Sequence, residues 1–144
     1  MTGPERLMRL LKYAFIISVL LFALITIRLP SRAMHPPQRP IELIIVLLAL
    51  LDVALGWNGQ RFFSQLAQAN SRGTIKSTPL NQWFAANIFS LAVMESCALF
   101  AIVLHFLGSS STLVGLLFVC SLVALVFWNP GTPPTAVDES GISR

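Results

Sequence analysis

One ionisable side chain lies in the middle of a long apolar segment of this 144-residue chain. Residues 84–107 read FAANIFSLAVMESCALFAIVLHFL, and Glu95 stands near their midpoint. A helix of that length rises about 36 Å, which is enough to cross the hydrocarbon core of a bilayer. An ionised carboxylate at the centre of such a helix costs about 2.5–3.5 kcal/mol on insertion scales. Glu95 therefore needs a partner, a proton or a function.

Two interpretations of Glu95 follow from its position. In the first, its carboxyl takes up and releases a proton or binds a cation, as intramembrane ionisable groups often do. In the second, a protonated carboxyl donates one hydrogen bond to a neighbouring helix and fixes the register of packing. Both interpretations predict that Glu95 is buried against other helices.

Asp52 is the second candidate for handling an ion or a proton. It lies a little more than one turn before Trp57, so the sequence places it near the membrane interface. It is then either one end of an ion path to Glu95 or, more simply, an interfacial carboxylate paired with Arg61. The same helical face carries small residues that let another helix approach closely. That face consists of Ala49, Asp52, Gly56 and Gly59.

The segment that carries Glu95 also has a stripe of small and polar residues at helical spacing, which we expect to face protein. The stripe consists of Asn87, Met94, Ala98, Ala101 and His105. Leu99, Phe100 and Phe106 are then left for lipid. His105 lies near a helix end, where a histidine is most often a hydrogen-bonding side chain. It could also serve as an axial ligand of haem or chlorophyll.

Other chemistries find no support in the sequence. There is no Gly-rich phosphate loop, no HExxH motif, and no nucleophile with a base at a suitable spacing, so we expect no enzyme. Histidines, cysteines and carboxylates do not cluster as metal ligands do, so neither a metal nor another cofactor is expected. The net charge is +4, but the ten basic residues are scattered between apolar segments, which argues against nucleic acid as a partner.

The composition is that of a membrane protein. Hydrophobic residues make up 55% of the chain and charged residues only 11%, against about 25% charged in soluble domains. We predict an all-α, integral membrane four-helix bundle made of two transmembrane hairpins, as a single domain over residues 1–128. Its bilayer-spanning segments are predicted at about 7–28, 41–57, 84–107 and 112–128. Residues 129–144 have the composition of a disordered tail.

The segments between the spans add smaller expectations. Ser31, Arg32 and Ala33 resemble a signal-peptidase site, although the charges around them favour a retained first span. Within 58–80, a short interfacial helix is predicted around Phe62 and Phe63. Ser111 and Gly115 form a small-residue pair suited to a helix contact.

Basic residues set the expected orientation in the membrane. With four spans, the N-terminal leader, the middle loop and the tail share one side and hold seven of the ten lysines and arginines. The segment 28–40 holds the other three. Because basic residues concentrate in cytoplasmic segments, we expect both termini in the cytoplasm.

Residues 92–108, AVMESCALFAIVLHFLG, resemble a group of small, uncharacterised bacterial four-span membrane proteins. The matching positions are Ala92, Glu95, Ala98, Leu99, Phe100, Val103, Leu104, Phe106, Leu107 and Gly108. The Glu-centred hairpin of that group in turn looks like the c-subunit, or proteolipid, of rotary ATPases. The resemblance implies a location in the bacterial inner membrane and carriage of protons or sodium ions on Glu95.

Three functions remain open from the sequence. The favoured one is a small accessory or assembly subunit of a larger membrane complex, with the lipid bilayer and other membrane subunits as partners. The alternative is a proteolipid-like homo-oligomer that handles protons or cations through Glu95, in which case the partner is the protein itself. A third is a pigment- or haem-associated subunit that uses His105.

Overall fold

The computed structural model describes residues 3–30, 39–59, 61 and 79–133, and these residues form an all-α four-helix protein without strands. The fold class predicted from the sequence is confirmed. The helices are α1 (Gly3–Arg28), α2 (Arg39–Trp57), α4 (Pro79–Phe106) and α5 (Ser111–Phe127).

Three of these helices, α1, α2 and α4, are long and apolar enough to cross a membrane. The fourth, α5, is also apolar but has only 17 residues, which corresponds to about 26 Å of helix. Large apolar side chains point outward along α1 and α2, with Leu20 and Leu21 on the first and Leu47 and Leu51 on the second all about half exposed. A soluble monomer rarely exposes so much apolar surface, whereas a bilayer covers it.

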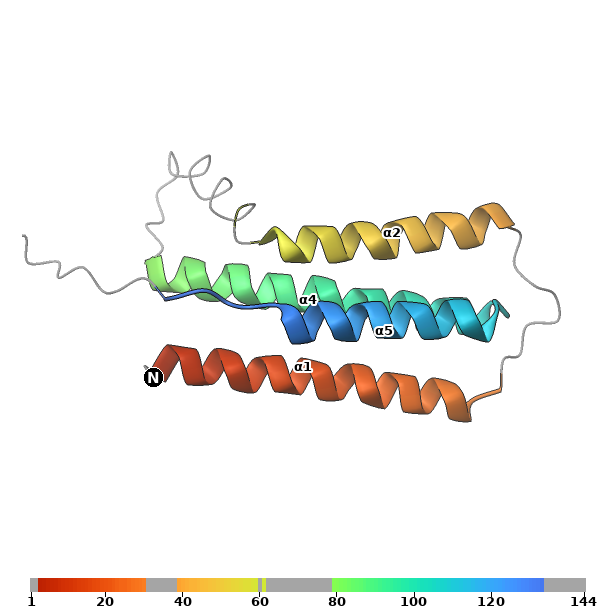
Figure 1. Cartoon of the computed structure of the whole chain (residues 1–144), viewed down its shortest axis with the longest axis horizontal. Helices are drawn as coiled ribbons and strands as arrows, with labels where there is room; N and C mark the ends of the chain where they lie inside the picture. Colours follow the sequence, from red (N-terminus) through yellow and green to blue (C-terminus); the bar gives the residue numbers. More distant parts are fainter. Residues whose placement is uncertain (1–2, 31–38, 60, 62–78, 134–144) are drawn as a thin grey trace, which may run out of the picture.

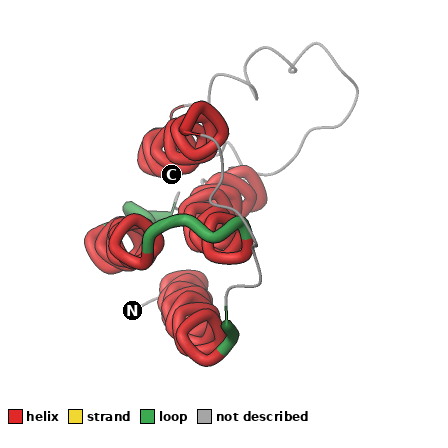
Figure 2. Tube along the Cα trace, turned by 90° about the vertical axis from the view of Figure 1, so that its right-hand side faces the viewer, coloured by secondary structure: helices red, strands yellow, loops and turns green. Residues whose placement is uncertain are grey.

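The helices alternate in direction and form a diamond in cross-section (Figures 1 and 2). The central helices α4 and α5 each contact every other described helix. α1 and α2 lie on opposite sides of this central pair and do not contact each other. The prediction that the first two helices form a packed hairpin is therefore wrong: α1 and α2 follow one another in sequence but do not contact each other, and α2 instead pairs with α4.

The core is centred on α4. Leu91, Met94, Cys97 and Leu104 are fully buried along it. They pack with buried residues of the three other helices. Those neighbours are Val19 on α1, Ala49 on α2, and Val114, Leu117, Phe118, Ala124 and Leu125 on α5. α4 supplies more buried core residues than any other described helix.

The turn between α4 and α5 follows from its residues. Gly108 has a φ of 83°, a left-handed conformation that glycine adopts without steric cost. Its N–H bonds to the His105 carbonyl, and the N–H of Ser109 bonds to the Leu104 carbonyl, which is the Schellman ending of a helix. Ser110 then caps α5 by accepting a hydrogen bond from the Leu113 N–H at 3.3 Å. The two central helices are thus joined by a tight, well-capped turn.

Lys12 ties α1 to the end of α5. Its Nζ donates hydrogen bonds of 2.7 Å to the carbonyl oxygens of Val126 and Trp128. Carbonyls at a helix C-terminus lack partners within the helix. A cation there also interacts favourably with the negative end of the helix dipole.

Several expectations lie outside the described residues. They are the possible cleavage site at 31–33, the interfacial helix around Phe62 and Phe63, and most of the predicted tail. Residues 129–133, which belong to that predicted tail, are described and contain no helix. The small-residue pair is wrong as a contact within this chain, because Ser111 and Gly115 are both exposed and no atom lies within 4 Å of a Cβ placed on Gly115.

Candidate functional site

Glu95 lies at the edge of the uncovered side of α4. Because α5, α1 and α2 cover three sides of α4, its fourth side remains exposed between α1 and α2. We define this surface as the open face of α4; it consists of Ala85, Ile88, Ala92, Leu99, Val103 and Phe106, all exposed. Glu95 lies beside this stripe on the helix surface, three residues after Ala92 and four before Leu99, and it is half-buried.

The carboxyl of Glu95 has no hydrogen-bond or ion-pair partner in the described part of the chain. The expectation that other helices bury it is met only in part, since the side chain is half-buried. α1 and α2 both contact α4 but do not contact each other, so the described helices do not close over the open face beside Glu95.

Other polar side chains in the membrane-spanning part of α4 do find partners within the chain. Asn87 donates to the Trp83 carbonyl at 2.8 Å, and Ser90 donates to the Ala86 carbonyl at 2.9 Å. His105 Nε2 lies 2.8 Å from the Leu29 carbonyl at the end of α1. Buried polar groups are costly when they have no hydrogen-bond partner. These bonds mean that the three side chains need no partner from another protein.

The stripe predicted to face protein lies mostly inside the bundle. Asn87, Met94, Ala98 and Ala101 are fully buried, and His105 is half-buried. Of the three positions assigned to lipid, Leu99 and Phe106 are exposed. Phe100 is instead half-buried and packs against the core. An axial-ligand role of His105 would have to use Nδ1, since Nε2 is taken by the Leu29 carbonyl.

Asp52 is bonded to Ser96, the residue that follows Glu95. The Ser96 hydroxyl lies within hydrogen-bond distance of Asp52 Oδ2 and also of the Val93 carbonyl oxygen, the latter at 2.6 Å. The predicted pair with Arg61 is wrong: no ion pair involves Asp52 in the described residues. Through Ser96, Asp52 lies against the middle of α4, at the residue that follows Glu95.

The glycines of α2 explain this register. A Cβ placed on Gly56 would lie 2.8 Å from Met94 Cγ and 2.9 Å from the Ser90 carbonyl oxygen. A Cβ on Gly59 would overlap the Ser90 hydroxyl. The small face predicted on α2 is thus the surface on which α4 rests, and this close approach brings Asp52 against Ser96. We call this contact the α2–α4 seam.

Sequence reasoning missed Ser96. A hydroxyl next to a mid-span carboxyl could have drawn attention to this position. However, serines in helices commonly bond their own backbone, so the residue alone does not indicate which neighbouring helix it contacts. Only the pairing of α2 with α4 shows that Ser96 meets a carboxyl.

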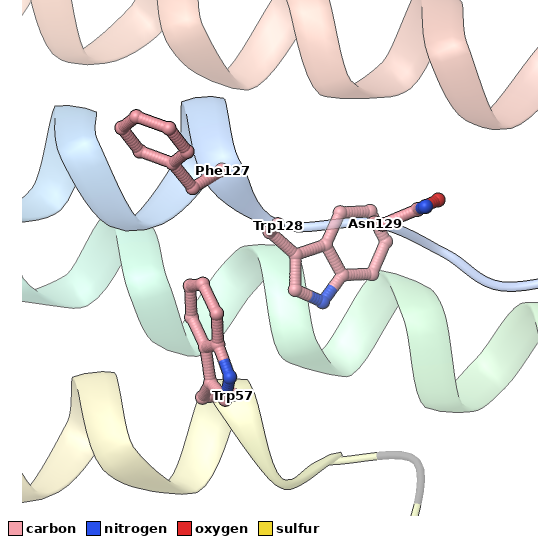
Figure 3. A pocket seen from close by; sticks show the side chains of 4 residues that line it. All are labelled: Trp57, Phe127, Trp128 and Asn129. Carbon is pink, nitrogen blue, oxygen red and sulfur yellow. The ribbon is translucent and has the colours of Figure 1, made fainter.

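A hollow of about 210 Å³ opens where α2 and α5 end, lined by Trp57, Phe127, Trp128 and Asn129 (Figure 3). Trp57 and Phe127 are exposed, and the nearby Trp83 Nε1 donates to the Pro130 carbonyl at 3.1 Å. Tryptophans at the ends of spans typically lie at the membrane–water interface. The hollow has no charged lining residue, and we assign it to that interface.

No group of three or more histidine, cysteine or acidic side chains in the described residues could hold a metal ion. Comparisons with protein-family models, with curated proteins and with solved structures found no match to this chain. The likeness to a proteolipid therefore stays a prediction, and the function has to be argued from the two carboxyls and the surfaces around them.

Proposed function

We propose that the protein is an accessory or assembly subunit of a larger membrane complex and that it docks through the open face of α4. The observation that carries the proposal is the unsatisfied carboxyl of Glu95. The other polar side chains described above for α4 are bonded within the chain, whereas Glu95 has no partner in the described residues. A mid-span carboxyl without a partner is costly, and a second protein can supply what the chain lacks.

The shape of the face supports a helix as the occupant. Ala85 and Ala92 are small, and small residues at helix interfaces in membranes let two backbones approach closely. α1 and α2 flank α4 without contacting each other, so the described helices leave this side of α4 open to a further helix. The occupant we propose is a transmembrane helix of a different protein.

Charge complementarity specifies the chemistry of that helix. A carboxyl in the membrane pairs best with a cation or a hydrogen-bond donor, so the partner should carry a lysine, arginine, histidine, asparagine or glutamine at the depth of Glu95. A second copy of this chain fits less well through the same face, because it would place one Glu95 against another.

The orientation belongs to the same proposal. The distribution of basic residues supports placing both termini in the cytoplasm, with the protein in the inner membrane of a bacterium.

The test is photo-crosslinking in the native membrane, with the reactive residue at position 92 or, as a matched control, at the exposed Val119 of α5. We expect position 92 to give an adduct with one other membrane protein, through a spanning segment that has a donor side chain at mid-depth. The adduct should disappear with Glu95→Leu, and position 119 should give only lipid. Exchanging the charges of Glu95 and the partner residue should restore it.

Three results would contradict the docking proposal. They are an adduct between two copies of this chain, equal labelling from positions 92 and 119, and an adduct that survives Glu95→Leu.

A second candidate is proton or cation handling by a homo-oligomer. One observation favours it: Asp52 bonds to Ser96, next to Glu95, so two carboxyls lie at a similar depth in the membrane. Under this candidate, vesicles that contain the protein dissipate a pH gradient, and Glu95→Gln, which keeps the shape but cannot ionise, abolishes the flux. Flux unchanged by Glu95→Gln would exclude Glu95 as the carrier.

A further inference from the structure

A cleft of about 350 Å³ lies between α2 and α5, at the end of the bundle where both helices begin (Figure 1). α2 packs mainly against α4 and contacts α5 much less. Two charged and three aliphatic side chains line this space, which we call the α2–α5 cleft. They are Arg39, Glu42, Leu43 and Val46 on α2 and Leu113 on α5.

The lining of the cleft changes from charged to apolar along α2. Arg39 is the first residue of the helix, and Glu42 follows about one turn later. Val46 lies seven residues after Arg39, which corresponds to about 10 Å along the helix axis. Val46 and Leu113 are partly buried and pack against the core. An occupant of the cleft therefore needs a polar head at the end of the bundle and an apolar part that extends toward the middle of the membrane.

The two charges of the cleft are opposite, and neither has a hydrogen-bond or ion-pair partner in the described residues. Arg39 is exposed and Glu42 is half-buried. Side chains three residues apart on a helix have Cβ atoms about 5–6 Å apart. The cleft thus has a cation and an anion side by side and no net charge, at the end of a span where lipid headgroups lie.

A phospholipid with a primary ammonium group matches this pattern. Its phosphate is an anion that a guanidinium binds with two parallel hydrogen bonds. Its ammonium has three N–H donors, which a carboxylate accepts. In a phosphoethanolamine headgroup two carbons join the phosphate to the ammonium, so the two groups reach two side chains that are one helical turn apart. The acyl chains then extend toward the apolar part of the cleft.

We propose that the α2–α5 cleft binds one molecule of phosphatidylethanolamine from the bilayer, with its phosphate on Arg39, its ammonium on Glu42 and an acyl chain along the aliphatic lining. Phosphatidylglycerol has no cation for Glu42, and the ammonium of phosphatidylcholine has no N–H donor. No lining residue belongs to α4, so the site is separate from the open face of α4 and does not rest on the proposed function.

Native mass spectrometry of the full-length protein tests this proposal, in a mild detergent with equal amounts of phosphatidylethanolamine, phosphatidylcholine and phosphatidylglycerol that have identical acyl chains. We expect one bound phosphatidylethanolamine, retained about fivefold more than either competitor, as one exposed ion pair supplies. Glu42→Gln should turn the preference toward phosphatidylglycerol, because only the cation remains. Arg39→Gln should remove every preference. Arg9→Gln, which removes a cation near the start of α1 at the other end of the bundle, is the matched control and should change nothing.

A second pair of variants tests the apolar part of the cleft. Leu43 is 59% exposed, so Leu43→Trp leaves the core intact but fills the cleft, and retention of all three lipids should fall. Leu47→Trp, at an exposed position of α2 outside the cleft, should keep the wild-type preference.

Four results would overturn the proposal. They are equal retention of the three lipids by the wild-type protein, a wild-type protein that carries detergent alone, a preference for phosphatidylethanolamine that survives Arg39→Gln or Glu42→Gln, and lipid retention unchanged by Leu43→Trp. The first two are measured on the wild-type protein and do not depend on the folding of any variant.

Discussion

The two central helices each leave one side uncovered, and the two sides differ in chemistry. The open face of α5 consists of Thr112, Gly115, Leu116, Val119, Val123 and Val126, with no ionisable group, and lipid can cover it without cost. The open face of α4 has a similar run of apolar and small residues but is bordered by Glu95, whose carboxyl has no partner in the described residues. Two faces of similar apolarity therefore need not have the same environment. A single carboxyl distinguishes the proposed docking face on α4 from the face on α5 that lipid can cover.

The largest effect is expected where α2 closes one edge of the open face of α4. Gly56→Val places a branched side chain against the Ser90 carbonyl and Met94, and we expect it to lower the free energy of unfolding by about 3 kcal/mol. The matched control is Gly115→Val on the open face of α5, where no atom lies within 4 Å of an added Cβ. Denaturant titration of the purified protein in detergent measures both. Equal effects would mean that α2 does not rest on α4 as described.

The two membrane carboxyls should differ when each is truncated to alanine. Asp52→Ala removes a hydrogen bond to Ser96, so we expect a loss of about 1 kcal/mol in the free energy of unfolding of the isolated chain. Glu95→Ala removes no bond within the described chain, and its effect should stay within about 0.5 kcal/mol. The same titration compares them. A larger loss for Glu95→Ala would reveal a partner inside the chain and remove the main support for docking.

A smaller effect is expected inside the pair of central helices. Ser121 of α5 is fully buried and donates to the Met94 carbonyl of α4 at 2.8 Å. Ser121→Ala should lower the free energy of unfolding by about 0.6 kcal/mol, the average for such bonds between helices in membranes. Ser111→Ala, at an exposed position of α5, is the control and should have no effect. A null result at Ser121 would mean that packing alone holds α4 against α5.

The smallest effect on the isolated chain is expected on the open faces themselves. Ala92→Leu on α4 and Val119→Leu on α5 both change exposed side chains, so each should alter the free energy of unfolding by less than about 0.5 kcal/mol. They should differ in the membrane, where only Ala92→Leu places a larger side chain on the open face of α4 and blocks the partner. Native mass spectrometry from a mild detergent measures retention of the partner subunit. Loss of the partner with both variants would mean that the two faces act together.

Residue type and helical spacing placed the helices and several of their buried positions. The predicted segments 41–57 and 112–128 differ by only a few residues from α2 and α5. The α4 helix begins earlier than the predicted span, at Pro79, because proline suits the first turn of a helix. The small face of α2 also follows from sequence alone, since only small residues permit such close approach.

The contact of Asp52 with Ser96 and the lack of a partner for Glu95 among the described residues did not follow from spacing. Counting residues back from Trp57 placed Asp52 near the interface, but α2 is set against the middle of α4 by Gly56 and Gly59, which brings Asp52 to Ser96. Glu95 was expected inside because a carboxyl in a span needs cover. A helical wheel gives the direction of a side chain and does not tell which neighbouring helix lies in that direction.

The sequence by itself thus determined that this chain is helical, apolar enough for a membrane, and provided with two carboxyls inside its apolar segments, because these properties are local and depend on composition and period. The tertiary structure decided which carboxyl is satisfied. α4 and α5 meet at the centre, α1 and α2 are kept apart, and the side of α4 next to Glu95 stays uncovered. That outcome depends on contacts between residues far apart in sequence, such as Asp52 with Ser96, and no local pattern encodes it.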